Sequence, residues 1–263
     1  MSVEITQAKG GQPAWQNAEL ADPHASPEKA GKVRRMFSAI AESYDLNNRV
    51  HSLWQDQRWR RIAVKTAEVN TGDAVLDVAC GTGDLTQLFA KTGASRVVGS
   101  DFTPAMLDVA RKKMESLPAS VQAKVSYEEG DAQALRFADA SFDVVSIAFG
   151  IRNVEQPRRA LAEFARVLRP GGRLIVLEFD GQPRNGLVRW FNGLYCQRIM
   201  PRTATLISGD TSGAYKYLPA SVGTFMTRPE MESAIGTAGF DDVSSTALSM
   251  GICVCYRGVR KGR

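Results

Sequence analysis

The order of apolar and polar positions predicts a chain in which short buried strands alternate with helices. Brief apolar runs have the length of strands that are covered on both faces, and the segments between them repeat apolar residues at helical spacing. The predicted strands are 74–79, 96–100, 125–129, 142–149 and 174–179. The predicted helices are 84–91, 104–115 and 157–168. This α/β alternation predicts a doubly wound, mostly parallel sheet with helices on both faces.

Three segments fall outside the alternation. Residues 1–27 are polar and contain prolines and a Gly-Gly pair, which predicts a flexible leader. Residues 28–70 have helical spacing that is interrupted at 44–48, and they predict an N-terminal helical lid. Residues 182–229 interleave aromatic residues with arginines and predict an inserted helical cap. The chain is expected to end with a helix and two strands, 229–238, 243–249 and 251–257, so that 28–263 forms a single domain.

Composition narrows the class of protein. Hydrophobic residues make up 44% of the chain and charged residues 23%, as in soluble globular proteins. Residues 1–27 lack the apolar block of a signal peptide, and no apolar run has the length of a membrane span, so a cytoplasmic protein is expected. The cysteines lack zinc-site spacing, and no metal is expected. The net charge of +5 suits nucleic acid or anionic lipid, but the basic residues are thinly spread, which favours a solvated surface.

A glycine-containing loop follows the first predicted strand. Its sequence runs from Asp77 to Asp84 as Asp-Val-Ala-Cys-Gly-Thr-Gly-Asp. Gly81 and Gly83 permit a tight turn against a ligand, at the strand end where such sheets bind ligands. A dinucleotide fingerprint would need a further glycine where this chain has Thr86, and there is no P-loop lysine. The loop therefore suits an adenosine and an amino-acid group better than a pyrophosphate.

Acidic residues at the next two strand ends complete this predicted site. Asp101 can accept hydrogen bonds from both ribose hydroxyls, and Asp131 can accept one from an adenine amino group beside the Ala132 amide. Asp77 can orient the amino-acid end through the loop. An aspartate at a strand end can instead cap a helix, but the joint order of the motifs favours a cofactor site. The predicted cofactor-binding residues are Asp77, Gly81, Thr82, Gly83, Asp101, Phe102, Asp131 and Ala132.

This order of motifs resembles the class I S-adenosylmethionine-dependent methyltransferases. The Arg-Pro-Gly-Gly-Arg turn at 169–173 fits the same pattern, so that the resemblance covers about 74–179. It implies a Rossmann-like sheet of seven strands, the last antiparallel, and S-adenosylmethionine as the cofactor.

Further motifs resemble a narrower family, the quinone-ring C-methyltransferases called UbiE or MenG. They are the Tyr-Asp pair at 44–45 with Asn48, Phe-Gly-Ile-Arg-Asn-Val at 149–154, Leu-Glu-Phe at 177–179, and Gly-Asp with Ala-Tyr-Lys-Tyr-Leu and Ser-Val at 209–222. The resemblance implies C-methylation of a polyprenylated quinol, either demethylmenaquinol or a polyprenyl-methoxy-benzoquinol. Trp54 stands where the family usually has glycine. Ala148 stands where many members have a cofactor-binding serine, so it is given no cofactor role.

The resemblance also implies a polar group beside the quinol ring. Arg152 stays cationic and suits stabilisation of phenolate charge. Asn153 can hydrogen-bond a ring oxygen, and Tyr44 can do the same or relay a proton through water. The structural alternatives are that Arg152 pairs with Glu155 or caps a helix and that Tyr44 only packs.

Expectations about partners are less specific. The 182–229 cap can hold an isoprenoid tail and contact anionic headgroups at the inner face of the membrane, or it can simply cover the sheet. A homodimer is compatible with the family. Nucleic acid is disfavoured because the Pro-Pro and Pro-Cys motifs of nucleic-acid methyltransferases are absent after the fourth strand. The intact loop disfavours a non-catalytic binding protein, while another small-molecule acceptor stays open.

Overall fold

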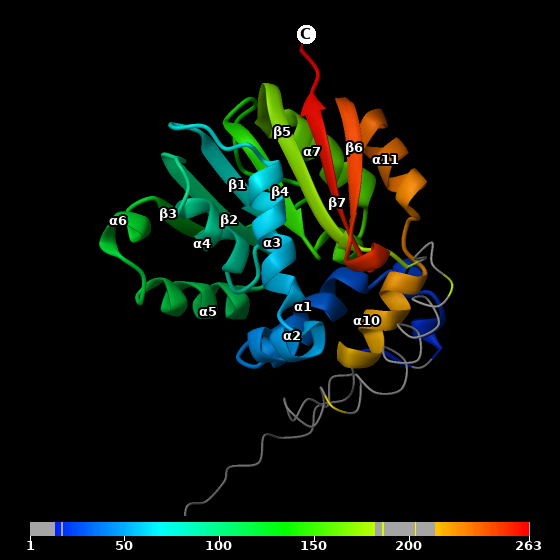
Figure 1. Cartoon of the computed structure of the whole chain (residues 1–263). Coiled ribbons are helices and arrows are strands. Elements are labelled where there is room, and N and C mark those ends of the chain that lie inside the picture. Colours follow the sequence, from blue (N-terminus) through cyan, green and yellow to red (C-terminus); the bar gives the residue numbers. More distant parts are fainter. Residues whose placement is uncertain (1–13, 17, 182–185, 187–202, 204–213, 263) are drawn as a thin grey trace, which may run out of the picture.

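The architecture is a seven-stranded sheet in the order β3-β2-β1-β4-β5-β7-β6 (Figure 1). The computed structural model describes residues 14–16, 18–181, 186, 203 and 214–262. The strands are β1 (Ala74–Val78), β2 (Arg96–Asp101), β3 (Val125–Glu129), β4 (Phe142–Ala148), β5 (Leu168–Phe179), β6 (Phe240–Leu248) and β7 (Cys253–Arg260). Strands β1 to β5 pair in parallel, and β7 is antiparallel to both β5 and β6. The predicted fold class is confirmed, including the reversed last strand.

Helices cover both faces because successive strand residues point to opposite sides. On one face Leu76 packs with α7 (Pro157–Val167) and α11 (Arg228–Thr237). On the other face Val75 packs with α3 (Gln55–Thr66) and α4 (Asp84–Ala90). Figure 1 shows α3 across the near face of the sheet and α7 behind it. The remaining helices of the sheet region are α5 (Pro104–Met114) and α6 (Ala119–Gln122).

The N-terminal helices gather at the carboxyl ends of the parallel strands (Figure 1). They are α1 (Lys29–Ile40) and α2 (Tyr44–Ser52), followed by α3, and α10 (Ala214–Gly223) lies beside them. The break predicted at 44–48 is wrong, because these residues begin α2. Asn47, in the middle of this segment, points into the fold and is only 2% exposed. The breaks lie instead before Tyr44 and at Leu53 and Trp54, which have positive φ angles of 51° and 61°.

The leader predicted to be flexible over 1–27 is packed in its described part. Two short helices, η1 (Glu19–Ala21) and η2 (Pro23–Ala25), precede α1. Trp15 is 3% exposed and stacks on Tyr217 of α10 with ring centroids 4.7 Å apart. Residues 1–13 and 17, and most of the predicted cap from 182 to 213, lie outside the described residues.

Strand and helix bounds differ from the predicted ones mainly at turns. Strand β5 begins at Leu168, six residues before the predicted start at Leu174, because the Pro-Gly-Gly turn interrupts its pairing with β4 and does not end it. Thr103 is the N-cap of α5 by position, but its side chain makes no capping hydrogen bond. None of the helices that the structure describes is long and apolar enough to cross a bilayer.

Candidate active site

A cavity of about 800 Å³, open to solvent, lies beyond the carboxyl ends of β1, β2, β3 and β4. The strand ends are level, since Val78 of β1 pairs with Ser100 of β2 and Ile147 of β4, and the following loops therefore meet. Helix α1 and the start of α2 close the other side. The cavity wall includes Val33, Phe37, Tyr44, Gly81, Asp101, Phe102, Asp131, Ala132, Phe149 and Asn153.

The β1–α4 loop needs both of its glycines, for different reasons. Gly81 and Gly83 have positive φ angles of 55° and 81°. A Cβ atom on Gly83 would lie 2.3 Å from the Tyr127 hydroxyl oxygen, whereas one on Gly81 would meet nothing within 4 Å. Gly83 therefore permits close packing within the fold, and Gly81 leaves open space toward the cavity.

The Asp101 carboxylate stabilises the loops that follow β1 and β2. Its Oδ2 accepts a hydrogen bond from the Gly81 N–H and its Oδ1 accepts one from the Thr103 N–H, each at 2.8 Å. Burial raises the pKa of this carboxyl group, while the two backbone donors oppose the shift. Each carboxylate oxygen keeps a further lone pair, and the residue lines the cavity, so ribose hydroxyls can donate to it.

The far end of the cavity combines an acidic and an apolar wall. Asp131 lines it and accepts hydrogen bonds on Oδ1 from the Gln133 N–H at 2.9 Å and from Gln133 Nε2 at 3.2 Å. Ala132 and the Phe102 ring lie in the same wall, and the Arg34 guanidinium lies 5.1 Å from the centre of that ring. This wall therefore offers a carboxylate acceptor beside apolar side chains.

Asp77 lies behind the loop rather than on the main cavity. It is 1% exposed, and its carboxylate accepts hydrogen bonds from the Thr86 hydroxyl at 2.6 Å and the Ser146 hydroxyl at 2.7 Å. Burial raises the pKa of Asp77 to about 6. Thr86, the residue at which the chain departs from the dinucleotide fingerprint, thus donates a hydrogen bond to Asp77. Ser146 was missed, although a hydroxyl within the apolar run 142–149 was the available signal.

Arg152 also lies outside the cavity wall. It belongs to η3 (Ile151–Asn153) and is 5% exposed. Its Nη1 donates to Glu178 Oε1 at 2.6 Å and to the Phe149 carbonyl at 2.7 Å. Arg152 is thus paired with Glu178 of β5. It is not paired with Glu155, which the structural alternative had named as its partner. An acidic residue in the apolar run 174–179 was the signal for this buried pair.

Asn153 and Tyr44 do line the cavity. The Asn153 Oδ1 accepts from the Tyr217 hydroxyl at 3.0 Å, and its Nδ2 donates to the Phe149 carbonyl at 3.2 Å. Tyr44 packs edge-on against Phe37 with ring centroids 5.9 Å apart, and burial raises the pKa of Tyr44, so its hydroxyl stays protonated. Tyr217 had been noted only as part of a motif, and no spacing linked it to Asn153.

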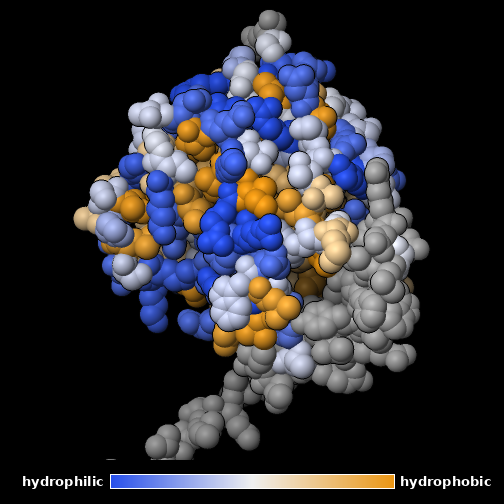
Figure 2. All heavy atoms as spheres, viewed as in Figure 1, coloured by the Kyte–Doolittle hydropathy of each residue, from blue (hydrophilic) through white to orange (hydrophobic). Residues whose placement is uncertain are grey.

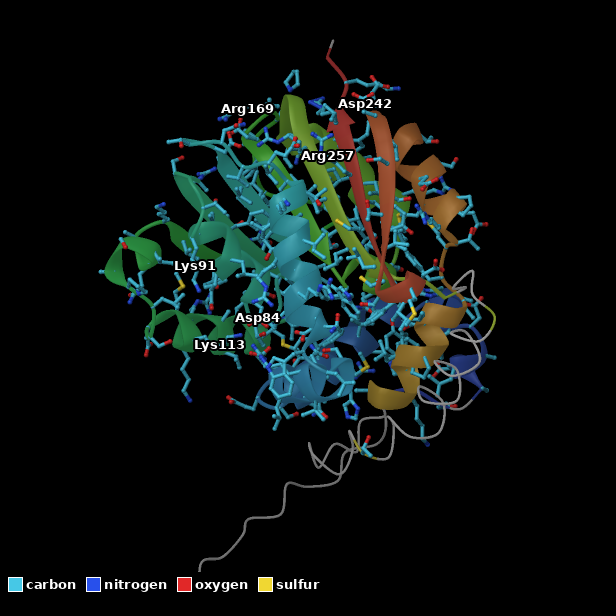
Figure 3. The ribbon with its side chains drawn as sticks, in the orientation of Figure 1. Asp84, Lys91, Lys113, Arg169, Asp242 and Arg257 are labelled. Atoms are coloured by element: carbon cyan, nitrogen blue, oxygen red, sulfur yellow. The ribbon has the colours of Figure 1, made fainter. Side chains whose placement is uncertain are left out.

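An ion-pair network fastens α2 onto the β1–α4 loop. Lys113 of α5 donates to Asp45 and to Asp84, each at 2.5 Å, and Figure 3 shows Lys113 and Asp84 turned toward each other. The Thr82 hydroxyl donates to Asp45 at 2.6 Å. Thr82, predicted to bind the cofactor, is thus 2% exposed and bonded to the lid.

Comparisons with known proteins agree with this geometry. The profile of the ubiE/COQ5 methyltransferase family matches residues 25–260. A demethylmenaquinone methyltransferase of Deinococcus radiodurans is 43% identical over 235 residues, which cover 89% of this chain and 95% of the relative. A ubiquinone/menaquinone biosynthesis C-methyltransferase UbiE of Geobacter sulfurreducens is 40% identical over 233 residues, with 88% and 89% covered.

Solved structures support the fold alone. A possible histamine N-methyltransferase of Thermotoga maritima superposes with a TM-score of 0.61 at 22% identity, covering 87% of this chain and 100% of that one. The family match implies S-adenosylmethionine as the methyl donor. The family match extends from before α1 to the end of β7 and contains every residue of the cavity wall. The chain belongs to the ubiE/COQ5 methyltransferase family of S-adenosylmethionine-dependent enzymes.

Proposed function

We propose that this enzyme methylates a ring carbon of a polyprenylated quinol, either demethylmenaquinol or a polyprenyl-methoxy-benzoquinol. The observation that carries the proposal is that one cavity joins Asp101 and Asp131 to Tyr44 and Asn153. The first pair suits an adenosine group, and the second pair suits the oxygen of an aromatic ring. The names of the relatives support the same two quinols.

The residues of the first half fit S-adenosylmethionine. Asp101 has lone pairs left for ribose hydroxyls, Gly81 leaves open space, and Phe102 and Ala132 supply an apolar wall for adenine. When bound, this cofactor supplies a methyl group that its positive sulfur makes electrophilic. The proposal includes no metal, because the methyl group is already activated.

The second half of the cavity must activate the ring carbon. A quinol carbon becomes a better nucleophile when the neighbouring hydroxyl loses its proton, so the enzyme must favour the phenolate. The Asn153 amide keeps one N–H without a partner among the described residues, and we assign it to the ring oxygen. The Tyr44 hydroxyl is assigned to the same oxygen, or to a water that carries the proton away. The side chains of Phe37 and Phe149 give this part of the cavity an apolar wall.

We also assign Arg152 to stabilisation of the phenolate, although its side chain lies outside the cavity wall and acts through the position of Asn153. Its bonds to Glu178 and to the Phe149 carbonyl hold the turn from which Asn153 projects. We further propose that the enzyme acts at the cytoplasmic face of the membrane in which a polyprenylated quinol dissolves, and no nucleic-acid partner is proposed.

The test is methyl transfer from labelled S-adenosylmethionine to each reduced quinol in detergent. We expect label in at least one quinone. The Asn153→Ala variant should lower kcat by about 100-fold, the usual loss on removing one donor to a developing oxyanion. Asn70→Ala, at an exposed asparagine outside the cavity, should leave kcat unchanged. Absence of label from both quinols, with cofactor binding intact, would refute the acceptor.

A further inference from the structure

Four large apolar side chains project into solvent from helix α2 and from two neighbouring turns. They are Leu46, Leu53, Trp54 and Met250, with exposed fractions of 55%, 79%, 59% and 74%. A single exposed leucine needs no explanation. These residues, however, lie on α2, on the α2–α3 turn and on the η5 turn (Ser249–Gly251). The two turns touch, because the Ser249 hydroxyl contacts the Gln55 amide at 3.3 Å and accepts from the indole N–H of α3 at 2.9 Å.

The backbone at these turns is unfavourable for the residues that occupy it. Leu53, Trp54 and Met250 have positive φ angles of 51°, 61° and 57°. Glycine adopts this region without strain, whereas side chains with a Cβ are disfavoured there. The fold gains nothing by holding a leucine, a tryptophan and a methionine in water at such positions. Their presence points to a contact made outside the folded chain.

The outer face of α2 continues the apolar surface. Leu46, Val50 and Leu53 are spaced by four and three residues and therefore share one side of the helix. Asn47 faces the interior instead, where it is 2% exposed. Figure 2 shows hydrophobic residues gathered at the end of the molecule where α2 lies.

Unpaired cations lie next to this apolar surface. Arg58, Arg61 and Lys65 are exposed and spaced by three and four residues, so they form one stripe along α3 that begins beside Trp54. None of the three forms an ion pair with another described residue. Figure 2 shows hydrophilic residues over α3 directly beside the apolar patch. Apolar side chains for the acyl boundary beside cations for headgroups are the features of a surface that binds an anionic bilayer.

We propose that this docking surface, formed by the apolar side chains of α2 and the two turns and by the α3 cations, binds an anionic lipid bilayer. The same helix α2 begins with Tyr44 in the cavity wall. Docking therefore brings the cavity next to the lipid in which a polyprenylated quinol dissolves. The purpose of docking rests on the proposed function, but binding to lipid is measurable without any substrate.

The test uses the full chain and sedimentation with vesicles of phosphatidylcholine, with and without phosphatidylglycerol. Wild type should bind the vesicles that contain phosphatidylglycerol. In the variant with Leu53→Gly, Trp54→Gly and Met250→Gly, binding should fall roughly tenfold or more. Its melting temperature should equal or exceed that of wild type, because glycine suits each φ angle. The matched control is Ala140→Gly, an exposed position with a φ angle of 53° at the opposite end of β4.

The charge component is tested separately. Replacing Arg58, Arg61 and Lys65 by glutamine should lower binding to phosphatidylglycerol vesicles by about fivefold per charge. Unchanged vesicle binding by the glycine variant would overturn the proposal. The proposal would also be overturned if wild type formed a dimer and the glycine variant lost that dimer but kept its vesicle binding. The surface would then join two copies of the chain.

The docking proposal and the proposed function can fail independently. The glycine variant should methylate a short-tailed quinol in detergent at the wild-type rate, because none of its changed residues lines the cavity. Vesicle binding by a wild type that methylates neither quinol would support docking and refute the acceptor. Methylation without any vesicle binding would refute docking alone.

Discussion

Replacing Asp101 by asparagine changes one atom of the carboxylate to which two loops are tied. In the wild type each oxygen accepts one backbone hydrogen bond, from Gly81 on Oδ2 and from Thr103 on Oδ1. Asparagine has a single oxygen, so one of these N–H groups loses its acceptor and faces the amide NH₂. The residue is 7% exposed, and water cannot readily take over.

The expected loss follows from this geometry. One hydrogen bond to a charged group contributes about 1.5–3 kcal/mol, and a buried donor without an acceptor costs about 1–3 kcal/mol. The neutral amide recovers part of this, because burial raises the pKa of Asp101 and so opposes its charge. We expect the free energy of unfolding to fall by about 2–4 kcal/mol. Loss of an acceptor for the ribose hydroxyls should weaken cofactor binding by about 100-fold, or about 2.7 kcal/mol.

Urea unfolding measures the first effect, and calorimetry with S-adenosylhomocysteine measures the second. Asp108→Asn is the matched control, because Asp108 is exposed and its one ion pair with a described residue is with Arg111, at 3.0 Å, on the outside of α5. It should change stability by less than about 0.5 kcal/mol. Wild-type affinity in Asp101→Asn would show that this carboxylate does not hold the ribose, and the cofactor half of the cavity would have to be reassigned.

Two further predictions concern the same loop. Burial raises the pKa of Asp77 from 3.8 to about 6, so the folded chain holds a proton that the unfolded chain releases, and stability falls as pH rises through this window. Asp77→Asn should remove this pH-dependent fall in stability. The variant should be more stable than wild type by about 1–3 kcal/mol in urea unfolding at about pH 8. If stability still falls over this pH range in the variant, Asp77 is not the group responsible. Gly81→Ala should lower the free energy of unfolding by about 1–2 kcal/mol because of its φ angle alone. Gly83→Ala should lower it by about 1–3 kcal/mol more because its Cβ atom clashes with Tyr127. Equal losses in calorimetric unfolding would contradict this packing.

The sequence predicted the sheet and the family because both depend on local patterns. Strands β1 and β4 are buried apolar runs bounded by turn residues, and the cofactor motifs lie at or just after the ends of β1, β2 and β3. The break predicted at 44–48 failed because a polar residue can point into the fold from a helix, as Asn47 does with its bond to the Ser43 carbonyl. The packing of the described part of the leader was missed because Trp15 finds its stacking partner in Tyr217, about 200 residues away along the chain. Periodicity contains no information about such partners.

The role of Arg152 in the catalytic half of the cavity also depends on a partner that the sequence pattern does not identify. A sequence motif identifies Arg152 as a permanent cation, which suggests direct stabilisation of phenolate charge. In the structure its charge is opposed by Glu178 at 2.6 Å, so the pair adds little net positive potential at the ring. What the pair does provide is fixed geometry, since Arg152 and Asn153 both donate to the carbonyl of Phe149, whose φ angle is 57°. The Tyr217 hydroxyl and the Phe149 carbonyl fix the Asn153 amide, and the second N–H of its Nδ2, which has no partner among the described residues, is the donor left for the cavity. On this argument the buried arginine acts as a positioning residue, and the asparagine is the group that touches the ring.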